Sequence, residues 1–357
     1  MYTCKPGYEE AQRRVNMFWN HEDADRPLVN ISFPKPGAEP FPEKKYATQE
    51  ARWLDVNYRI DSSAHNAENT VFYADSMPVV YPNLGPEIFS AWSGCPYIFG
   101  ETTTWTEPCI DDWDRDGPKA VTDRRHPLYI ILDDFAKGLI ERGKGNFIVG
   151  LTDFHPGGDH VAALRDPERF AVDLLEHPEK VRRKLASSYP EYYPIYDYFT
   201  KMIKDAGMPV ATWTPLPSEE TMYVPSNDFS CMISTEMFVD FFLDGIIGEC
   251  KHYAHSIYHL DGRDALRHLN VILSIPELNA LQWVPGAGHE QVSRWINVYK
   301  RVLAAGKSIQ INGVYPDDLP LLMENLPARG VWLCMRGIGD EETASDVMKT
   351  IERWGKR

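Results

Sequence analysis

Residues 256–262 read SIYHLDG, and three segments of the same kind follow: ALQWVPG at 280–286, KSIQING at 307–313 and GVWLCMRG at 330–337. Each is a short, largely apolar run that ends at a glycine, which is typical of a buried strand. Helical patterns separate these runs, so that successive strands are spaced by roughly one βα unit. The alternation predicts an α/β fold with a parallel sheet.

Segments of the same kind occur four more times upstream, which brings the predicted strands to eight. Eight strands alternating with helices predict a (β/α)8 TIM barrel, and we expect one such domain over residues 1–357. An open, doubly wound sheet is the alternative, but no GxGxxG motif follows the first strand. The upstream strands are expected at PLVNISF (27–33), PVVYP (78–82), NFIVGLTDF (146–154) and MYVPSNDF (222–229).

The length beyond an ordinary barrel lies in the N-terminal half, as an N-terminal extension and elaborated loops. Residues 83–125 are rich in aromatic residues, Gly and Pro. We expect them to form an aromatic loop insertion over the active face, with a short hairpin at 96–106. Long helices are expected at 126–143 and 234–256, the second with Ser234 as its N-cap.

The net charge argues against two classes of partner. Lys and Arg number 37 against 52 Asp and Glu, which gives a formal net charge of −15, so the protein repels phosphate backbones and anionic lipid. No segment approaches the ~20 consecutive apolar residues of a membrane span, and the first residues carry charges where a signal peptide is apolar. We expect a cytoplasmic protein that binds neither nucleic acid nor membranes. Its six dispersed cysteines are expected to be reduced thiols.

Polar residues stand at the carboxyl ends of several predicted strands, where the reaction site of such a barrel lies. His259 and Asp261 share one face of their strand because side chains alternate, so both point toward the barrel mouth. An imidazole beside a carboxylate can ligate a divalent metal or act in general acid–base catalysis. Asp228 is a further candidate catalytic residue, and Gln282 and Asn312 are predicted to bind a small substrate.

Two other segments and one cysteine carry further candidates. DFHPGGDH (153–160) contains His155, a candidate substrate-binding or metal-binding residue, unless the segment only caps the following helix. Cys334 either completes a metal site with His259 across the barrel mouth or is a buried inert thiol. Aromatic walls suit an apolar or cationic ligand, and plain packing of the long loop is the alternative. The predicted pocket walls are Trp92, Trp105 and Trp283.

Four long stretches together carry a family resemblance. They are SNDFSCMISTEMFVDFF (226–242), YHLDGRDALRHLNVILSIPELNALQWVPGAG (258–288), NLGPEIFSAWSGCPYIFGETTTWTEP (83–108) and LTDFHPGGDHVAALRDPERF (151–170). The sequence thereby resembles the uroporphyrinogen decarboxylase superfamily, in the branch labelled trimethylamine corrinoid protein 2, near the corrinoid:coenzyme M methyltransferases. The resemblance implies a TIM barrel and one-carbon chemistry.

The resemblance also implies a metal site. Thiol methyltransferases of this superfamily bind zinc through a His-x-Cys pair and a distal Cys, and the metal activates a thiol. His259 matches the histidine, Asp261 stands where the first Cys would be, and Cys334 lies a few residues before the usual distal position. A zinc site at these three residues is therefore expected, and a site for a harder metal with oxygen ligands is the alternative. The basic RQAGRY-type segment of true uroporphyrinogen decarboxylases is replaced by FPKPGAEPFPEKKY (33–46), so porphyrinogen decarboxylation is not expected.

The leading hypothesis is a metal-assisted methyltransferase that moves a methyl group between a small-molecule donor or acceptor and a corrinoid. No DxHxxG-type cobalamin-binding sequence is present, so the corrinoid is expected on a separate partner protein. One alternative is a metal-free decarboxylase or lyase acting on a small carboxylic acid, with His259 and Asp261 as its acid–base pair. Another is a non-catalytic partner of a corrinoid protein.

Overall fold

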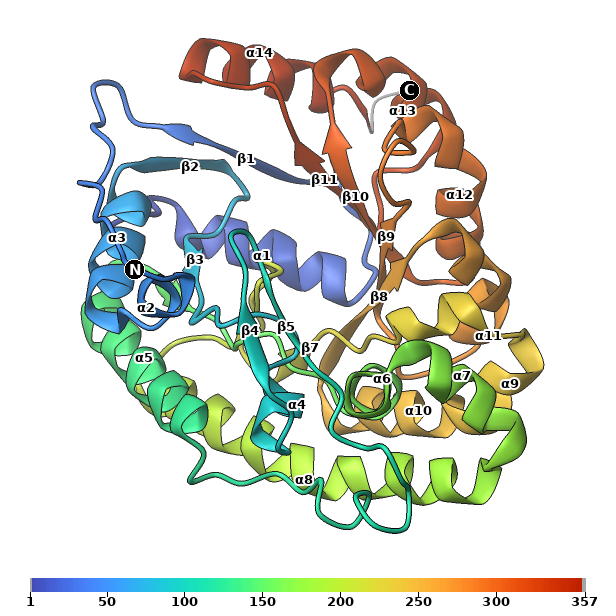
Figure 1. Cartoon of the computed structure of the whole chain (residues 1–357). Helices are drawn as coiled ribbons and strands as arrows, with labels where there is room; N and C mark the ends of the chain where they lie inside the picture. The colour runs from blue at the N-terminus through green and yellow to red at the C-terminus, as the bar shows by residue number, and fades with distance from the viewer. Residues whose placement is uncertain (1, 355–357) are drawn as a thin grey trace.

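A curved sheet of seven strands forms the centre of the computed structural model, which describes residues 2–354 (Figure 1). The order across the sheet is β2–β1–β11–β10–β9–β8–β7. All neighbours are parallel except β2, which is antiparallel to β1 at one edge. The strands are β1 (Leu28–Pro34), β2 (Thr70–Ala74), β7 (Met222–Tyr223), β8 (His255–Asp261), β9 (Ala280–Val284), β10 (Ser308–Val314) and β11 (Val331–Met335).

Helices surround the sheet (Figure 1), and one follows each of β8 to β11, as the alternating sequence pattern predicts. Among residues 2–354, no helix is both long enough and apolar enough to cross a membrane. The helices are α1 (Tyr8–Trp19), α2 (Gln49–Trp53), α3 (Val56–Glu68), α4 (Ile88–Trp92), α5 (Pro127–Gly143), α6 (Gly157–Arg165), α7 (Pro167–Glu176), α8 (Pro178–Asp205), α9 (Thr235–Phe241), α10 (Leu243–His252), α11 (Leu269–Leu273), α12 (Ile296–Ala304), α13 (Leu319–Asn325) and α14 (Glu341–Ile351). Four short 3-10 helices are η1 (Asp228–Met232), η2 (Arg263–His268), η3 (Val292–Trp295) and η4 (Pro316–Asp318).

The sheet does not close, so a TIM barrel is not confirmed; the fold shown is a mixed α/β fold with a central parallel sheet. Two of the eight expected strands, β3 (Val79–Val80) and β6 (Ile148–Val149), pair only with each other. Each of these two strands is only two residues long, so their ladder is short. The segment that leads to β3 is joined to β1 by one backbone bond, from Asp75 N–H to Val29 O at 3.0 Å, and by the Ser76 side chain. Next to β6, Leu151 N–H donates to Ala211 O at 2.7 Å.

The strands present two faces with different neighbours. One face carries Tyr258, Leu260 and Trp283, which belong to a large apolar core that extends under the surrounding helices. The opposite face carries Ile257 and Trp332, which belong to a second core with the N-terminal helix and the aromatic insertion. Toward the carboxyl ends of the strands, the side chains on this second face are polar instead of apolar. His259, Gln282 and Gln310 lie there.

The predicted hairpin at 96–106 is confirmed as β4 (Tyr97–Phe99) paired antiparallel with β5 (Thr104–Thr106). It lies so close over Gly85 that a Cβ atom there would be 1.7 Å from Oγ1 of Thr104, and the φ of Gly85 is +100°. A residue without a side chain is therefore required where the insertion folds back. The helix expected at 234–256 is divided into α9 and α10, with Ser234 capping α9 through Met237 N–H.

Candidate active site

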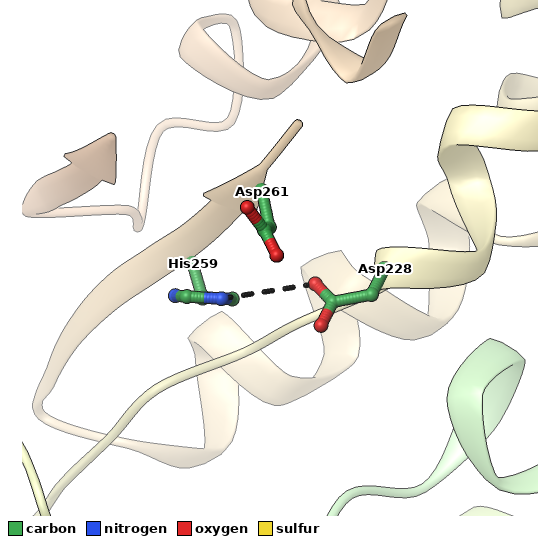
Figure 2. A group of neighbouring side chains, drawn as sticks. All are labelled: Asp228, His259 and Asp261. Carbon is green, nitrogen blue, oxygen red and sulfur yellow. Dashed lines mark ion pairs between the residues drawn. The ribbon is translucent and has the colours of Figure 1, made fainter. Parts of the chain in front are cut away.

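Three side chains with metal-binding donor atoms gather where β7 and β8 end (Figure 2). His259 and Asp261 are two residues apart on β8, so both point to the same side. Asp228 begins η1, two residues after Ser226, which forms a parallel bridge with His259. One donor atom from each lies within 4.8 Å of the other two, and Nε2 of His259 is 3.8 Å from Oδ1 of Asp228. The structure therefore brings the three predicted catalytic residues together.

A chain of side-chain hydrogen bonds runs from His259 across three neighbouring strands. Nδ1 of His259 contacts Oε1 of Gln282 on β9. Nε2 of Gln282 donates to Oε1 of Gln310 on β10 at 2.6 Å, and Nε2 of Gln310 donates to Sγ of Cys334 on β11 at 3.3 Å. Because Gln282 offers a carbonyl oxygen, Nδ1 of His259 carries the proton and Nε2 keeps its lone pair toward Asp228. An imidazole held in this tautomer is ready to bind a metal.

Cys334 lies at the far end of this chain and is not a member of the cluster. Two glutamine side chains separate it from His259, so Asp228 takes the place that the sequence analysis gave to Cys334. Burial raises the pKa of the Cys334 thiol to about 12, which disfavours the thiolate form that binds metals. Sequence reasoning missed the glutamine chain, although the register of β8, β9 and β10 places His259, Gln282 and Gln310 side by side.

A cavity of about 470 Å³ opens beside the cluster, which is a size typical of small-molecule sites. Asp228 and His259 form part of its wall, and Phe89 and Thr106 of the aromatic insertion form another part. Within the part of the chain that the structure describes, no lysine or arginine lines it, whereas five acidic residues do, so its charge favours neutral or cationic molecules. These acidic residues are Glu87, Asp153, Asp159, Asp166 and Asp228.

His155 lines this cavity and forms an ion pair with Asp153. Nε2 of His155 is 2.7 Å from Oδ1 of Asp153, and the side chains are 11% and 24% exposed. Burial lowers the pKa of His155, but the hydrogen bond and charge of Asp153, with the charges of Asp159 and Glu249, outweigh it and raise the pKa to about 9. His155 is therefore an imidazolium at neutral pH and can donate a proton into the cavity. The structure therefore places this predicted binding residue in the wall of the cavity.

Asp159 faces Asp228 across the hydroxyl of Ser226. That hydroxyl lies 3.1 Å from Oδ2 of Asp159 and 3.2 Å from Oδ1 of Asp228. Burial and the nearby charge of Asp228 raise the pKa of Asp159 to about 6, although Phe229 N–H donates to it at 3.0 Å. Asp159 lies in the first turn of α6, and its carboxylate accepts the Phe229 N–H at the start of η1.

The remaining predicted binding residues lie away from the cavity. Trp92 is 1% exposed and packs between Phe89 and Tyr129 in the core. Trp283 is on the opposite face of β9 from Gln282, since neighbouring residues alternate, and its ring packs against Trp295. Two of the predicted residues, Trp105 and Asn312, do not line the cavity, and Trp105 is exposed on the hairpin. The aromatic residues that do line it are Phe89, Trp213 and Phe229.

The comparisons with known proteins support the fold. No protein-family model matches the sequence, and no curated protein matches it. Among solved structures, a methyltransferase from Methanosarcina mazei is similar, with a TM-score of 0.62 and 11% sequence identity over 96% of this chain and 98% of that chain. A likeness at this identity shows a shared fold over nearly the whole length of both chains. It does not confirm the expected membership of the uroporphyrinogen decarboxylase superfamily.

Proposed function

We propose that this protein is a metal-assisted methyltransferase that moves a methyl group between a small substrate and a corrinoid held by a partner protein. The observation that carries the proposal is the Asp228–His259–Asp261 cluster at the wall of a cavity of small-molecule size. The fold shared with a solved methyltransferase supports the reaction class. We also propose that the fold is an opened form of the eight-stranded barrel, with β3, β6 and β7 as its shortened strands.

The donor set of the cluster fits a divalent metal, zinc in the first place. Zinc accepts imidazole nitrogen and carboxylate oxygen at roughly 2.0–2.2 Å, so two ligand atoms that share one ion lie about 3–4 Å apart. Nε2 of His259 and Oδ1 of Asp228 are 3.8 Å apart, and Asp261 supplies the third donor. Three protein ligands are typical of catalytic zinc sites, which keep one position for substrate.

The protein's own residues have separable roles in this proposal. A metal bound here would supply positive charge that lowers the pKa of a thiol or polarises a heteroatom next to the methyl group. Gln282 fixes the His259 tautomer through Nδ1, as its contact with that atom requires. His155 lines the same cavity, holds a proton because Asp153 stabilises its imidazolium, and can donate a proton to the heteroatom that loses the methyl group.

The charge of the cavity favours a neutral or cationic substrate. Carboxylates of Asp153, Asp159 and Asp228 face the cavity without a lysine or arginine among its described lining residues. A small carboxylic acid would meet like charge there, which argues against the decarboxylase alternative. A cavity of about 470 Å³ suits a small methyl donor or acceptor, so the corrinoid is proposed to approach from a partner protein.

Metal content tests the first part of the proposal. Protein purified anaerobically without added metal is expected to carry about one zinc per chain by elemental analysis. His259→Ala, Asp261→Ala and Asp228→Asn should each lose it, whereas Asp264→Asn, an exposed carboxylate outside the cluster, should keep it. Folded protein without metal in every sample would contradict the metal site. It would favour a metal-free lyase or a non-catalytic corrinoid-protein partner instead.

Methyl transfer tests the second part. The zinc-loaded protein is mixed anaerobically with methylcobalamin and small thiols, or with reduced cobalamin and neutral or cationic methyl donors, and the corrinoid absorbance is followed. We expect turnover that the three ligand variants lose and that Asp264→Asn retains. Turnover that survives both the ligand substitutions and a chelator would contradict the assigned role of the metal.

A further inference from the structure

Two cysteines outside the candidate active site lie in direct contact. Sγ of Cys95 is 3.1 Å from Sγ of Cys109. Cys95 follows α4 and Cys109 follows β5, so the β4–β5 hairpin lies between them in the chain. The backbone holds both ends in place, because Glu107 N–H donates to Pro96 O at 2.9 Å and Cys109 N–H donates to Leu164 O at 2.9 Å. The two thiols are therefore set against each other at the base of the hairpin.

A disulfide bond between them needs little movement. The S–S bond is about 2.05 Å long, so the two sulfur atoms must approach by about 1 Å from their present separation of 3.1 Å. Cys95 is buried at 4% exposure and Cys109 is half-buried. One sulfur is thus shielded within the core, and the other is the one that a small reagent in solvent can reach.

We propose that Cys95 and Cys109 are a site of reversible oxidation, at which a low-molecular-weight disulfide converts the two thiols into an intramolecular disulfide. Cys109 attacks one sulfur of the small disulfide, which releases one small thiol and leaves a mixed disulfide on Cys109. The sulfur of Cys95 then loses its proton, attacks the Cys109 sulfur and expels the second small thiol. Two electrons and two protons pass from the protein to the reagent, so one small disulfide becomes two thiols.

The groups around the two sulfur atoms make Cys109 the attacking thiol and Cys95 the resolving thiol. The hydrogen bond from Cys95 and the charge of Lys184 lower the pKa of Cys109 against the effect of burial, so Cys109 is the better nucleophile. The hydrogen bond to Cys109, with burial, raises the pKa of Cys95. Cys95 is therefore unreactive until the mixed disulfide forms beside it.

Oxidation at this site would restrict the motion of the β4–β5 hairpin, which forms part of the cavity wall. The hairpin ends at Thr106, which lines the cavity and donates from both N–H and Oγ1 to the Glu87 carboxylate at 2.6 Å. Pro108, next to Cys109, also lines it. A bond between Cys95 and Cys109 closes the segment that contains the whole hairpin, so we expect slower amide hydrogen exchange at Tyr97–Thr106 in the oxidised protein.

Intact-mass measurement tests the proposal directly. The reduced protein, as purified, is incubated with oxidised glutathione, quenched in acid and compared with Cys95→Ser, Cys109→Ser and Cys250→Ser. Wild type and Cys250→Ser, whose substituted thiol is buried elsewhere in the core, should lose about 2 Da, alkylate two fewer thiols and give a Cys95–Cys109 cross-linked peptide. Cys95→Ser should accumulate a glutathione adduct on Cys109, and Cys109→Ser should form neither product.

The same samples contain the outcomes that overturn the proposal. Circular dichroism and thermal melting first establish that each variant is folded. Folded wild type that keeps all its alkylatable thiols at every glutathione ratio would refute the site. So would a mass loss whose cross-linked peptide joins a different pair, or equal adduct formation in Cys95→Ser and Cys109→Ser. None of these readouts depends on methyl transfer or on a bound metal.

Discussion

Gln282 determines which nitrogen of His259 is free to bind a metal. Its Oε1 contacts Nδ1, and its Nε2 is held by Gln310 at 2.6 Å, so the amide is fixed in one orientation. Gln282→Leu removes the acceptor while keeping a side chain of similar size. Substituting a residue that hydrogen-bonds a metal ligand in this way typically lowers metal affinity by about 10–100-fold. We expect zinc affinity to fall by that factor in competition with a chromophoric chelator.

The same substitution at Gln291, an exposed residue in the loop before η3, is the matched control and should leave zinc affinity unchanged. If Gln282→Leu binds zinc as tightly as wild type, the hydrogen-bond chain across β8 to β11 does not support the ligand.

The charge of His155 depends on Asp153, and this dependence predicts a pH effect on stability. The pKa of His155 is raised to about 9 from an ordinary 6.5, so the ion pair stabilises the folded state below pH 6.5. This contribution is lost as the pH rises to about 9, because the folded protein then releases the proton too. It amounts to roughly 3 kcal/mol. Asp153→Asn should therefore be less stable than wild type below pH 6.5, and the difference should shrink above pH 9.

Urea unfolding at the two ends of this pH range measures the effect, and NMR titration of the imidazole follows His155 directly. Asp197→Asn is the control, since Asp197 contacts His252 at 2.8 Å on the surface, where ion pairs contribute little. A difference between wild type and Asp153→Asn that is constant across the range would contradict the assigned ion pair.

At the residue scale, sequence reasoning succeeds where alternation along one strand is enough. The spacing of His259 and Asp261 predicts that they share one face, the end of MYVPSNDF predicts Asp228 beside them, and the three lie together in the structure. Trp283 was misplaced because it neighbours Gln282 and must therefore face the other side of β9. The expectation that Cys334 is the third ligand is not met, because its separation from His259 depends on how four strands are registered, which the sequence does not show.

Helix α10 carries a buried carboxyl group into a cluster of tyrosines. Glu249 is 1% exposed, and its nearest described partner is Tyr253, whose hydroxyl lies 3.5 Å from Oε2 and 2.9 Å from the hydroxyl of Tyr192 on α8. Burial raises the pKa of Glu249 to about 8 from 4.5, so the folded protein keeps a proton that the unfolded chain releases. The packing of α10 against α8 is therefore favoured at low pH.

This packing predicts that stability falls as the pH rises from 4.5 to about 8, by roughly 3–5 kcal/mol from this group. Glu249→Gln keeps the shape and removes the titration, so its unfolding free energy should stay flatter across that range and exceed that of wild type at pH 8. Glu324→Gln, at an exposed position of α13, should follow the wild-type curve. Parallel curves for wild type and Glu249→Gln would show that Glu249 is ionised in the folded protein.

At the element scale, the predicted strands β8 to β11 and the hairpin at 96–106 are confirmed because each is bounded by clear turn residues. Two features were missed. Residues 70–74 (TVFYA) form β2, an antiparallel edge strand. The alternation of strands and helices does not predict a strand there. The helix at 234–256 is divided at Phe242, where the backbone leaves the helical region, and its apolar spacing alone gave no sign of the break.

At the scale of the whole molecule, the segment between β2 and β3 is joined to β1 by side chains of Asp75 and Ser76 and by one backbone bond, from Asp75 N–H to Val29 O at 3.0 Å. Arg26 forms a buried ion pair with Asp75, whose Oδ2 also accepts Val29 N–H at 2.9 Å. Ser76 is 3% exposed; its Oγ accepts from Ile31 N–H at 2.6 Å and donates to Ile31 O at 2.7 Å. One serine hydroxyl thus contacts both backbone polar groups of Ile31, which is also paired in the β1–β2 ladder.

Ser76→Ala removes two buried hydrogen bonds to the backbone of Ile31, each worth about 0.5–1.5 kcal/mol. We expect the unfolding free energy to fall by roughly 1–3 kcal/mol in urea titrations at constant pH. Ser187→Ala is the matched control, because that hydroxyl donates to Lys184 O at 2.9 Å within its own helix, where the carbonyl keeps its helical partner. An equal, small loss in both variants would mean that the β1–β2 ladder satisfies the backbone of Ile31 without Ser76.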